Sequence, residues 1–245
     1  VCQLKAQGTI RHIGMSTHNP AVAKLAAKSG VIEMLLFSVN PAFDLLPASE
    51  HMEDYFKESY DDSLRGINPE REELYRLCEQ NQVGITVMKG YAGGRLFLPE
   101  TSPFGVALTP VQCIHYALTR PAVASIMAGY DTIAHVDAAV AYETAAENEK
   151  DYASVLAHAP AHAYYGQCTY CGHCAPCPAG IDIAMVNKLY DLAIMQQEVP
   201  ASLKAHYGQL AANAGDCIGC GGCERRCPFG VPVVKKMAQT AALFS

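Results

Sequence analysis

The sequence has no excess of positive charge and no long hydrophobic run. Its 18 lysine and arginine residues are scattered, and 24 acidic residues give the chain a formal net charge of −6. Because nucleic acids and anionic membranes attract basic patches, this balance gives no electrostatic case for either partner. No apolar run reaches the roughly 18 residues that a membrane-spanning helix needs, so we expect no membrane insertion.

Charged residues are few, at 17%, whereas 50% of the residues are hydrophobic. A chain of 245 residues with this composition can bury a sizeable core, and its length permits one large domain or two ordinary ones. The sequence begins at Val1, and residues 2–8 indicate the end of a helix with a glycine cap. We therefore expect the sequence to be a segment of a longer protein.

Cysteine is abundant, and eight of the eleven cysteines form two runs in the last third of the chain. The first run is Cys168, Cys171, Cys174 and Cys177, and the second is Cys217, Cys220, Cys223 and Cys227. Cysteines at every third position let one short loop offer three thiolates to an iron–sulfur cubane. In ferredoxins with two clusters, the cysteine before the proline ligates the other cluster. The runs therefore predict two [4Fe–4S] clusters, with Cys227 completing the first set and Cys177 the second.

Zinc and disulfides are the alternatives for these cysteines. Structural zinc usually takes two separated Cys-x2-Cys pairs, whereas disulfides need an oxidising compartment and are unusual at such close, regular spacing. Both fit the runs less well than iron–sulfur clusters, which favour a reducing cytoplasm. Only two residues separate Cys177 from Cys174, against three in the second run, so the spacing supports Cys177 least. The isolated Cys2, Cys78 and Cys113 are interpreted as buried or neutral thiols.

The part of the chain before the cysteines alternates strand and helix patterns. The predicted strands are 9–15, 31–39, 83–88 and 122–127, and the predicted helices are 21–29, 69–82, 109–119 and 132–148. This alternation is typical of an α/β parallel sheet, either open or half of a (β/α)8 barrel. In a half barrel, strands 9–15 and 122–127 become free edges because the sheet does not close.

Three segments favour the half barrel. Residues 4–16 (LKAQGTIRHIGMS), 83–96 (VGITVMKGYAGGRL) and 123–129 (VASIMAG) resemble the fifth, seventh and eighth strand regions of aldo/keto reductases. With the cysteine runs, the chain resembles the bacterial aldo/keto reductases that carry a C-terminal 4Fe–4S ferredoxin-type domain. The resemblance implies half of a (β/α)8 TIM barrel over residues 1–148. A ferredoxin-like domain follows over 149–245, mainly α-helical because helix patterns cover 149–158, 183–197, 201–212 and 232–243.

The resemblance also implies residues that bind a nicotinamide cofactor, NAD(P)H. Ser16 is expected to contact the nicotinamide carboxamide, Tyr91 to stack on the nicotinamide, and Gly93 and Gly94 to let backbone N–H groups approach the pyrophosphate. The simpler alternatives are a helix cap for Ser16, a packed aromatic for Tyr91 and an ordinary loop for the glycines. Residues 129–137 contain no lysine or arginine, where the family often has basic residues for the adenosine 2′-phosphate. We therefore expect weak nicotinamide binding with little preference for NADPH.

The resemblance implies an iron–sulfur oxidoreductase in which carbonyl or alcohol redox chemistry on the barrel is coupled to electron transfer through two [4Fe–4S] clusters. A small carbonyl or alcohol substrate and a ferredoxin or flavoprotein partner are implied. The family's catalytic Asp, Tyr, Lys and His belong to its first four strands, so no catalytic residue is assigned. This chain alone is expected to be inactive in carbonyl reduction. The alternative is an electron-transfer module on a degenerate, non-catalytic barrel scaffold.

Overall fold

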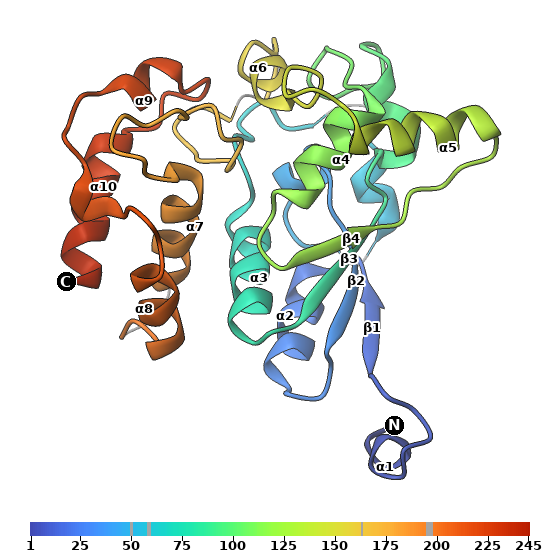
Figure 1. Ribbon diagram of the computed structural model, residues 1–245. Coiled ribbons are helices and arrows are strands. Elements are labelled where there is room, and N and C mark those ends of the chain that lie inside the picture. Colours follow the sequence, from blue (N-terminus) through green and yellow to red (C-terminus); the bar gives the residue numbers. More distant parts are fainter. Residues whose placement is uncertain (50, 58–59, 163, 195–197) are drawn as a thin grey trace. The chain divides into compact units, whose positions relative to one another are not determined.

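The computed structural model describes residues 1–49, 51–57, 60–162, 164–194 and 198–245 (Figure 1). The chain divides into two compact units, Val1–Tyr164 and Tyr165–Ser245. This division falls later in the chain than the expected domain boundary between residues 148 and 149. The reason is that helix α6 (Tyr152–Ala157) packs on helix α4 (Pro110–Leu118) and buries Tyr152, Ala153 and Leu156 within the first unit.

The first unit contains a four-stranded parallel sheet in the order β1-β2-β3-β4. The strands are β1 (Gly14–Thr17), β2 (Met34–Ser38), β3 (Gly84–Met88) and β4 (Val123–Ile126). Strands β1 and β4 lie at the edges, as predicted. An α/β fold of four parallel strands with helices, as in half of a (β/α)8 barrel, is therefore confirmed.

One helix precedes the first strand, and further helices follow the strands in the sequence. They are α1 (Cys2–Ala6), α2 (Pro20–Lys28), α3 (Pro69–Gln80), α4 (Pro110–Leu118), α5 (Ile133–Val140) and α6, with short 3-10 helices η1 (Phe43–Leu45), η2 (Met52–Phe56), η3 (Ala92–Phe97) and η4 (Ala141–Glu143). Helices α2 and α3 lie side by side along the sheet (Figure 1). The starts of α3 and α4 match the prediction because Asn68 and Thr109 cap them and proline occupies their first helical position.

The two faces of the sheet differ in burial. Leu35, Phe37, Ile85 and Val87 are fully buried, and the Phe37 ring meets the Tyr75 ring of α3 at 6.5 Å. The alternate residues form a row across the opposite face, in the register Ser16, Leu36, Thr86 and Ser125. None of these four side chains is fully buried, as expected for the inner face of an incomplete barrel.

Two predicted elements differ most from their observed bounds. The first strand was expected at 9–15 but begins at Gly14, because residues 9–12 are largely exposed and Ile13 joins the sheet only through its carbonyl, which accepts from Glu33 N at 2.8 Å. Ser16 therefore lies inside the strand. The helix expected at 132–148 ends at Val140, and η4 leads into a turn. There the Glu149 carboxylate accepts the Ala146 N–H at 2.8 Å.

The segment between β2 and α3 is fastened by a buried polar network that the sequence did not reveal. Asp44, on η1, is fully buried and accepts hydrogen bonds from the hydroxyls of Tyr75 and Tyr116. Arg71 is also fully buried. Its Nη1 lies 3.6 Å from Asp44 Oδ1 and donates to the Ser38 carbonyl at 3.0 Å. The network thus ties the irregular segment to α3 and α4.

The second unit is mainly helical, as predicted. Its helices are α7 (Ile183–Ala193), α8 (Ala201–Gly208), α9 (Gly222–Arg226) and α10 (Val233–Phe244), with the 3-10 helix η5 (Ala214–Asp216). Helices α7 and α10 pack together and bury Val186, Leu189 and Met237. The predicted helix 183–197 includes residues 195–197, which lie outside the described residues. Across the described parts of both units, no helix is long and apolar enough to span a membrane.

Candidate metal centre

The first cysteine loop is folded tightly by residues with left-handed backbone conformation. Tyr170 has φ 56° and Gly172 has φ 82°, and Ala175 N donates to the Gly172 carbonyl at 2.9 Å. The pKa of the Cys174 thiol is raised to about 12, mainly by burial and to a smaller extent by the neighbouring sulfurs of Cys168 and Cys171. The loop therefore brings the first three cysteines of the run together.

The second run shares a cavity with the last cysteine of the first. Cys177 lines this cavity together with Cys217, Cys220 and Cys223, which come from the loop before α9 and from α9 itself. Apolar side chains complete much of the lining, among them Ile181, Ile183, Val234 and Met237. Cys177, which the spacing supported least, therefore lines the same cavity as the three cysteines with which it is predicted to hold the second cluster.

Arg226 connects the two runs. Its Nη2 donates to the carbonyls of Cys174 and Pro176 at 2.6 and 2.7 Å. The sulfur of Cys223 also contributes to the raised pKa of Cys174. Cys227 follows Arg226, and its sulfur accepts a hydrogen bond from Val231 N at 3.4 Å. These contacts hold the two cysteine loops beside each other within the second unit.

The donor set of the two runs suits iron–sulfur clusters. Within the described ranges, no group of three His, Cys, Asp or Glu side chains is arranged to hold a single metal ion. A cubane places each cysteine on a different iron, and the two loops offer eight thiols for this purpose. The cysteines and their apolar surroundings therefore fit [4Fe–4S] clusters.

Three of the four residues predicted to bind a nicotinamide share one pocket. Tyr91, Gly93 and Gly94 line a pocket of about 590 Å³ after β3, together with Lys89 and Gly129. Gly93 and Gly94 have φ values of 68° and 88°, which other residues adopt only with strain. The Tyr91 ring packs 5.0 Å from the ring of Phe97, and burial raises the pKa of Tyr91.

Other parts of the nicotinamide prediction differ from this arrangement. Ser16 does not line the pocket, because it lies on β1, whereas the pocket follows β3 and the sheet order places β2 between them. The pocket also contains a His–Asp pair that sequence reasoning missed, in which His135 Nδ1 lies 2.5 Å from Asp131 Oδ1. The i, i+4 spacing of these two residues is a signal that would have found the pair.

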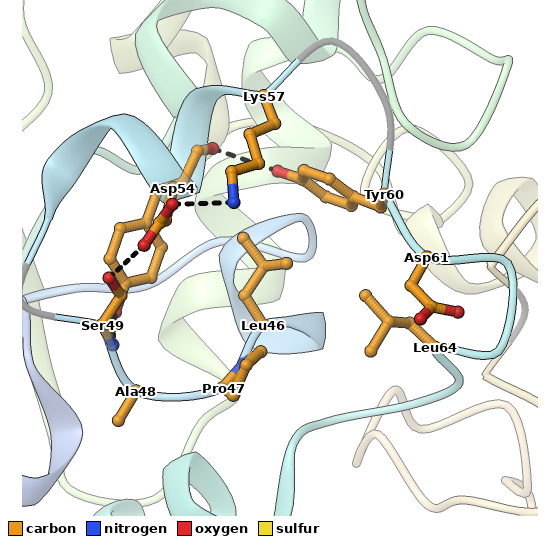
Figure 2. Close-up of a pocket in the computed structure, with 10 residues that line it drawn as sticks. Leu46, Pro47, Ala48, Ser49, Asp54, Lys57, Tyr60, Asp61 and Leu64 are labelled. Carbon is orange, nitrogen blue, oxygen red and sulfur yellow. Dashed lines mark hydrogen bonds and ion pairs between the residues drawn. The ribbon is translucent and has the colours of Figure 1, made fainter.

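Figure 2 shows a second pocket, of about 330 Å³, in the segment between β2 and α3. Asp54 points toward both Ser49 and Lys57, accepting a hydrogen bond from the serine hydroxyl and pairing with the lysine at 2.7 Å. Tyr60 donates its hydroxyl to the Tyr55 carbonyl at 3.1 Å. These polar groups bond to one another. We therefore interpret them as contacts that hold the loop in place rather than as a reaction site.

Comparison with known proteins identifies the cysteine-rich segment. Residues 167–232 match a protein family described as a 4Fe-4S dicluster domain. The matched range contains all eight cysteines of the two runs. This match supports 4Fe–4S cluster binding and confirms the predicted ferredoxin-type segment. No curated protein gives a significant match to the chain.

Two solved structures are similar to this chain. They are the holo and apo forms of the aldo-keto reductase AKR11C1 from Bacillus halodurans, each with 22% sequence identity and a TM-score of 0.44. The similarity covers 66% of this chain and 55% and 56% of the two structures, respectively. The chain therefore spans about half the length of these two structures.

The three isolated cysteines should differ sharply in reactivity. Cys78 and Cys113 are fully buried, and burial raises the pKa of each thiol to about 12. Cys2, in contrast, is exposed to solvent. Since the thiolate is the nucleophile, iodoacetamide at neutral pH should modify Cys2 and spare the other two in the folded protein. Mass spectrometry of peptides before and after unfolding measures this. Rapid labelling of Cys113 in the folded protein would contradict the burial of α4.

Proposed function

We propose that this chain belongs to an iron–sulfur oxidoreductase of the aldo/keto reductase type, whose carbonyl or alcohol chemistry is coupled to electron transfer through two [4Fe–4S] clusters. Cys168, Cys171, Cys174 and Cys227 hold one cluster, and Cys217, Cys220, Cys223 and Cys177 hold the other. When bound, the clusters supply one-electron transfer. The observation that carries the proposal is the cavity that Cys177 shares with three cysteines of the second run.

The surrounding residues control how the clusters are held. Ile181, Ile183 and Met237 form an apolar part of the wall of the second cluster's cavity, and solvent exposure is one determinant of cluster potential. Arg226 fixes the backbone on both sides of Ala175 by bonding to the carbonyls of Cys174 and Pro176. This contact holds Cys177 in reach of the second run.

In this proposal, the first unit binds the nicotinamide cofactor and the substrate. Gly93 and Gly94 leave the backbone after β3 accessible to a pyrophosphate, and Tyr91 offers an aromatic face. Ser16, on the edge strand β1, is proposed to contact the nicotinamide carboxamide. The substrate is a small carbonyl or alcohol, and the redox partner is a ferredoxin or flavoprotein in the cytoplasm. With no catalytic tetrad assigned, this chain alone is inactive in carbonyl reduction.

Nicotinamide binding should be weak and nearly indifferent to the 2′-phosphate. The pocket after β3 contains one lysine, Lys89, and an acidic group, Asp131. It therefore offers little positive charge to bind the 2′-phosphate that distinguishes NADPH from NADH. Fluorescence titration should therefore give similar affinities for NADH and NADPH. A Lys89→Gln change should weaken both equally, whereas a change of the exposed Lys28 to glutamine should have no effect. A strong preference for NADPH would contradict this assignment.

A second candidate function is supported by one observation. All eight cysteines lie in Tyr165–Ser245, which is compact by itself. An electron-transfer module on a non-catalytic scaffold needs no more than this unit. Stopped-flow oxidation of the reduced chain by a ferredoxin, measured with and without NADH, separates the two functions. Electron transfer to ferredoxin without any nicotinamide binding favours the module, whereas cluster reduction by NADH favours the coupled oxidoreductase.

A further inference from the structure

Helix α7 presents a buried amide to the first cysteine loop. Asn187 is 1% exposed, and its Nδ2 donates to the Cys168 sulfur at 3.6 Å. On the same helix, the apolar residues Val186 and Leu189 are buried as well. An amide placed among such neighbours costs free energy unless it forms hydrogen bonds, so its position calls for an acceptor.

The sulfur of Cys168 is that acceptor. Among the described residues, Asn187 Oδ1 has no hydrogen-bond partner, so the amide is not held by its oxygen. The opposite orientation would place the carbonyl oxygen against a thiolate, which is repulsive because both groups only accept hydrogen bonds. The donor side of the amide therefore faces the cysteine.

Asp191, one turn further along α7, keeps this contact in place. It is 5% exposed and accepts a hydrogen bond from the Tyr170 hydroxyl at 2.8 Å, within the same cysteine loop. Its other carboxylate oxygen pairs with Lys236 of α10 at 2.9 Å. Asp191 thus links the cysteine loop to α7 and α10, one helical turn away from the contact between Asn187 and Cys168.

We infer that Asn187 is a positioning residue that raises the reduction potential of the cluster bound by Cys168. The inference rests on the proposed function, since it requires a cluster there. An N–H group that donates to a ligand sulfur stabilises the extra negative charge of the reduced cluster, so it favours reduction. Asn187 donates to Cys168 and is not among the residues that line the cavity of the second run, so its effect is expected at one cluster.

The test is a redox titration of the anaerobically prepared full chain, followed by electron paramagnetic resonance. Asn187→Leu keeps similar volume and removes the donor. It should make reduction of one cluster about tenfold less favourable, which corresponds to a potential about 59 mV lower for one electron. The matched control is Thr240→Val, which removes a hydrogen bond of another fully buried side chain, from Thr240 Oγ1 to the Lys236 carbonyl, without touching a cysteine. It should leave both potentials unchanged.

A second variant guards against loss of folding. Asn187→Asp keeps the shape and adds a negative charge, so the same potential should fall further than in Asn187→Leu. Intact clusters with unchanged potentials in both variants overturn the inference, and so does an equal shift of both clusters. Absence of any iron–sulfur signal in the unmodified chain refutes the proposed function instead, so the two failures are distinguishable.

Discussion

Replacing Cys177 with alanine should remove the cluster of the second run and leave the cluster of the first run in place. Cys177 lies in the cavity of Cys217, Cys220 and Cys223, although it belongs to the first run by sequence. A cubane that has lost one of four thiolates is exposed to solvent and to loss of iron. The variant should therefore retain about half of its iron, with one reduced-cluster signal in place of two.

The reciprocal change, Cys227→Ala, should remove the other cluster. Substitution of the exposed Cys2 by serine is the control and should leave the iron content unchanged. If Cys177→Ala instead abolished the cluster of Cys168, Cys171 and Cys174, each run would hold its own cluster. The crossed assignment would then be wrong.

Removing Arg71 should destabilise the first unit more than any surface change. Arg71 and Asp44 are fully buried, so Arg71→Met leaves a buried carboxylate without its cation, at a cost of about 3–5 kcal/mol. It also removes the cation that stacks on the rings of Phe37 and Tyr55 at 5.1 and 5.3 Å. Urea unfolding followed by circular dichroism measures the free energy of unfolding.

A matched pair of variants makes this test specific. Lys5→Met breaks the exposed ion pair with Glu33 and should change the free energy of unfolding by no more than about 1 kcal/mol. The double change Arg71→Met with Asp44→Leu should recover part of the lost stability, because the Asp44 carboxylate is then no longer buried without Arg71. A cost for Arg71→Met no larger than that of the surface variant would show that Asp44 does not depend on it.

The order of the elements could be predicted because local signals agree with tertiary burial. The end of strand β3 at Met88 was predicted correctly. The strand pattern follows a polar helix end, and a glycine loop comes directly after it. The helix starts at Pro69 and Pro110 could be predicted because proline fixes the backbone at the first helical position. The edge positions of β1 and β4 followed from the half-barrel interpretation.

Features that depend on distant contacts could not be predicted. The first strand was placed too early because its extent is set by pairing with β2, which begins only at Met34. The Asp44 network joins residues up to 72 positions apart, through the Tyr116 hydroxyl. In the same way, the meeting of Asn187 with Cys168 depends on how α7 folds back onto the loop. Spacing gave the identity of the cysteines as candidate ligands, but not their surroundings.

The central claim is that the cysteine runs hold two [4Fe–4S] clusters. Quantification of iron and acid-labile sulfide in anaerobically prepared protein, combined with electron paramagnetic resonance of the reduced state, tests it most directly. Two clusters correspond to about eight irons and about eight sulfides per chain, with interacting paramagnetic signals. Zinc in place of iron, iron without sulfide, or about four of each per chain in fully loaded protein would contradict the account.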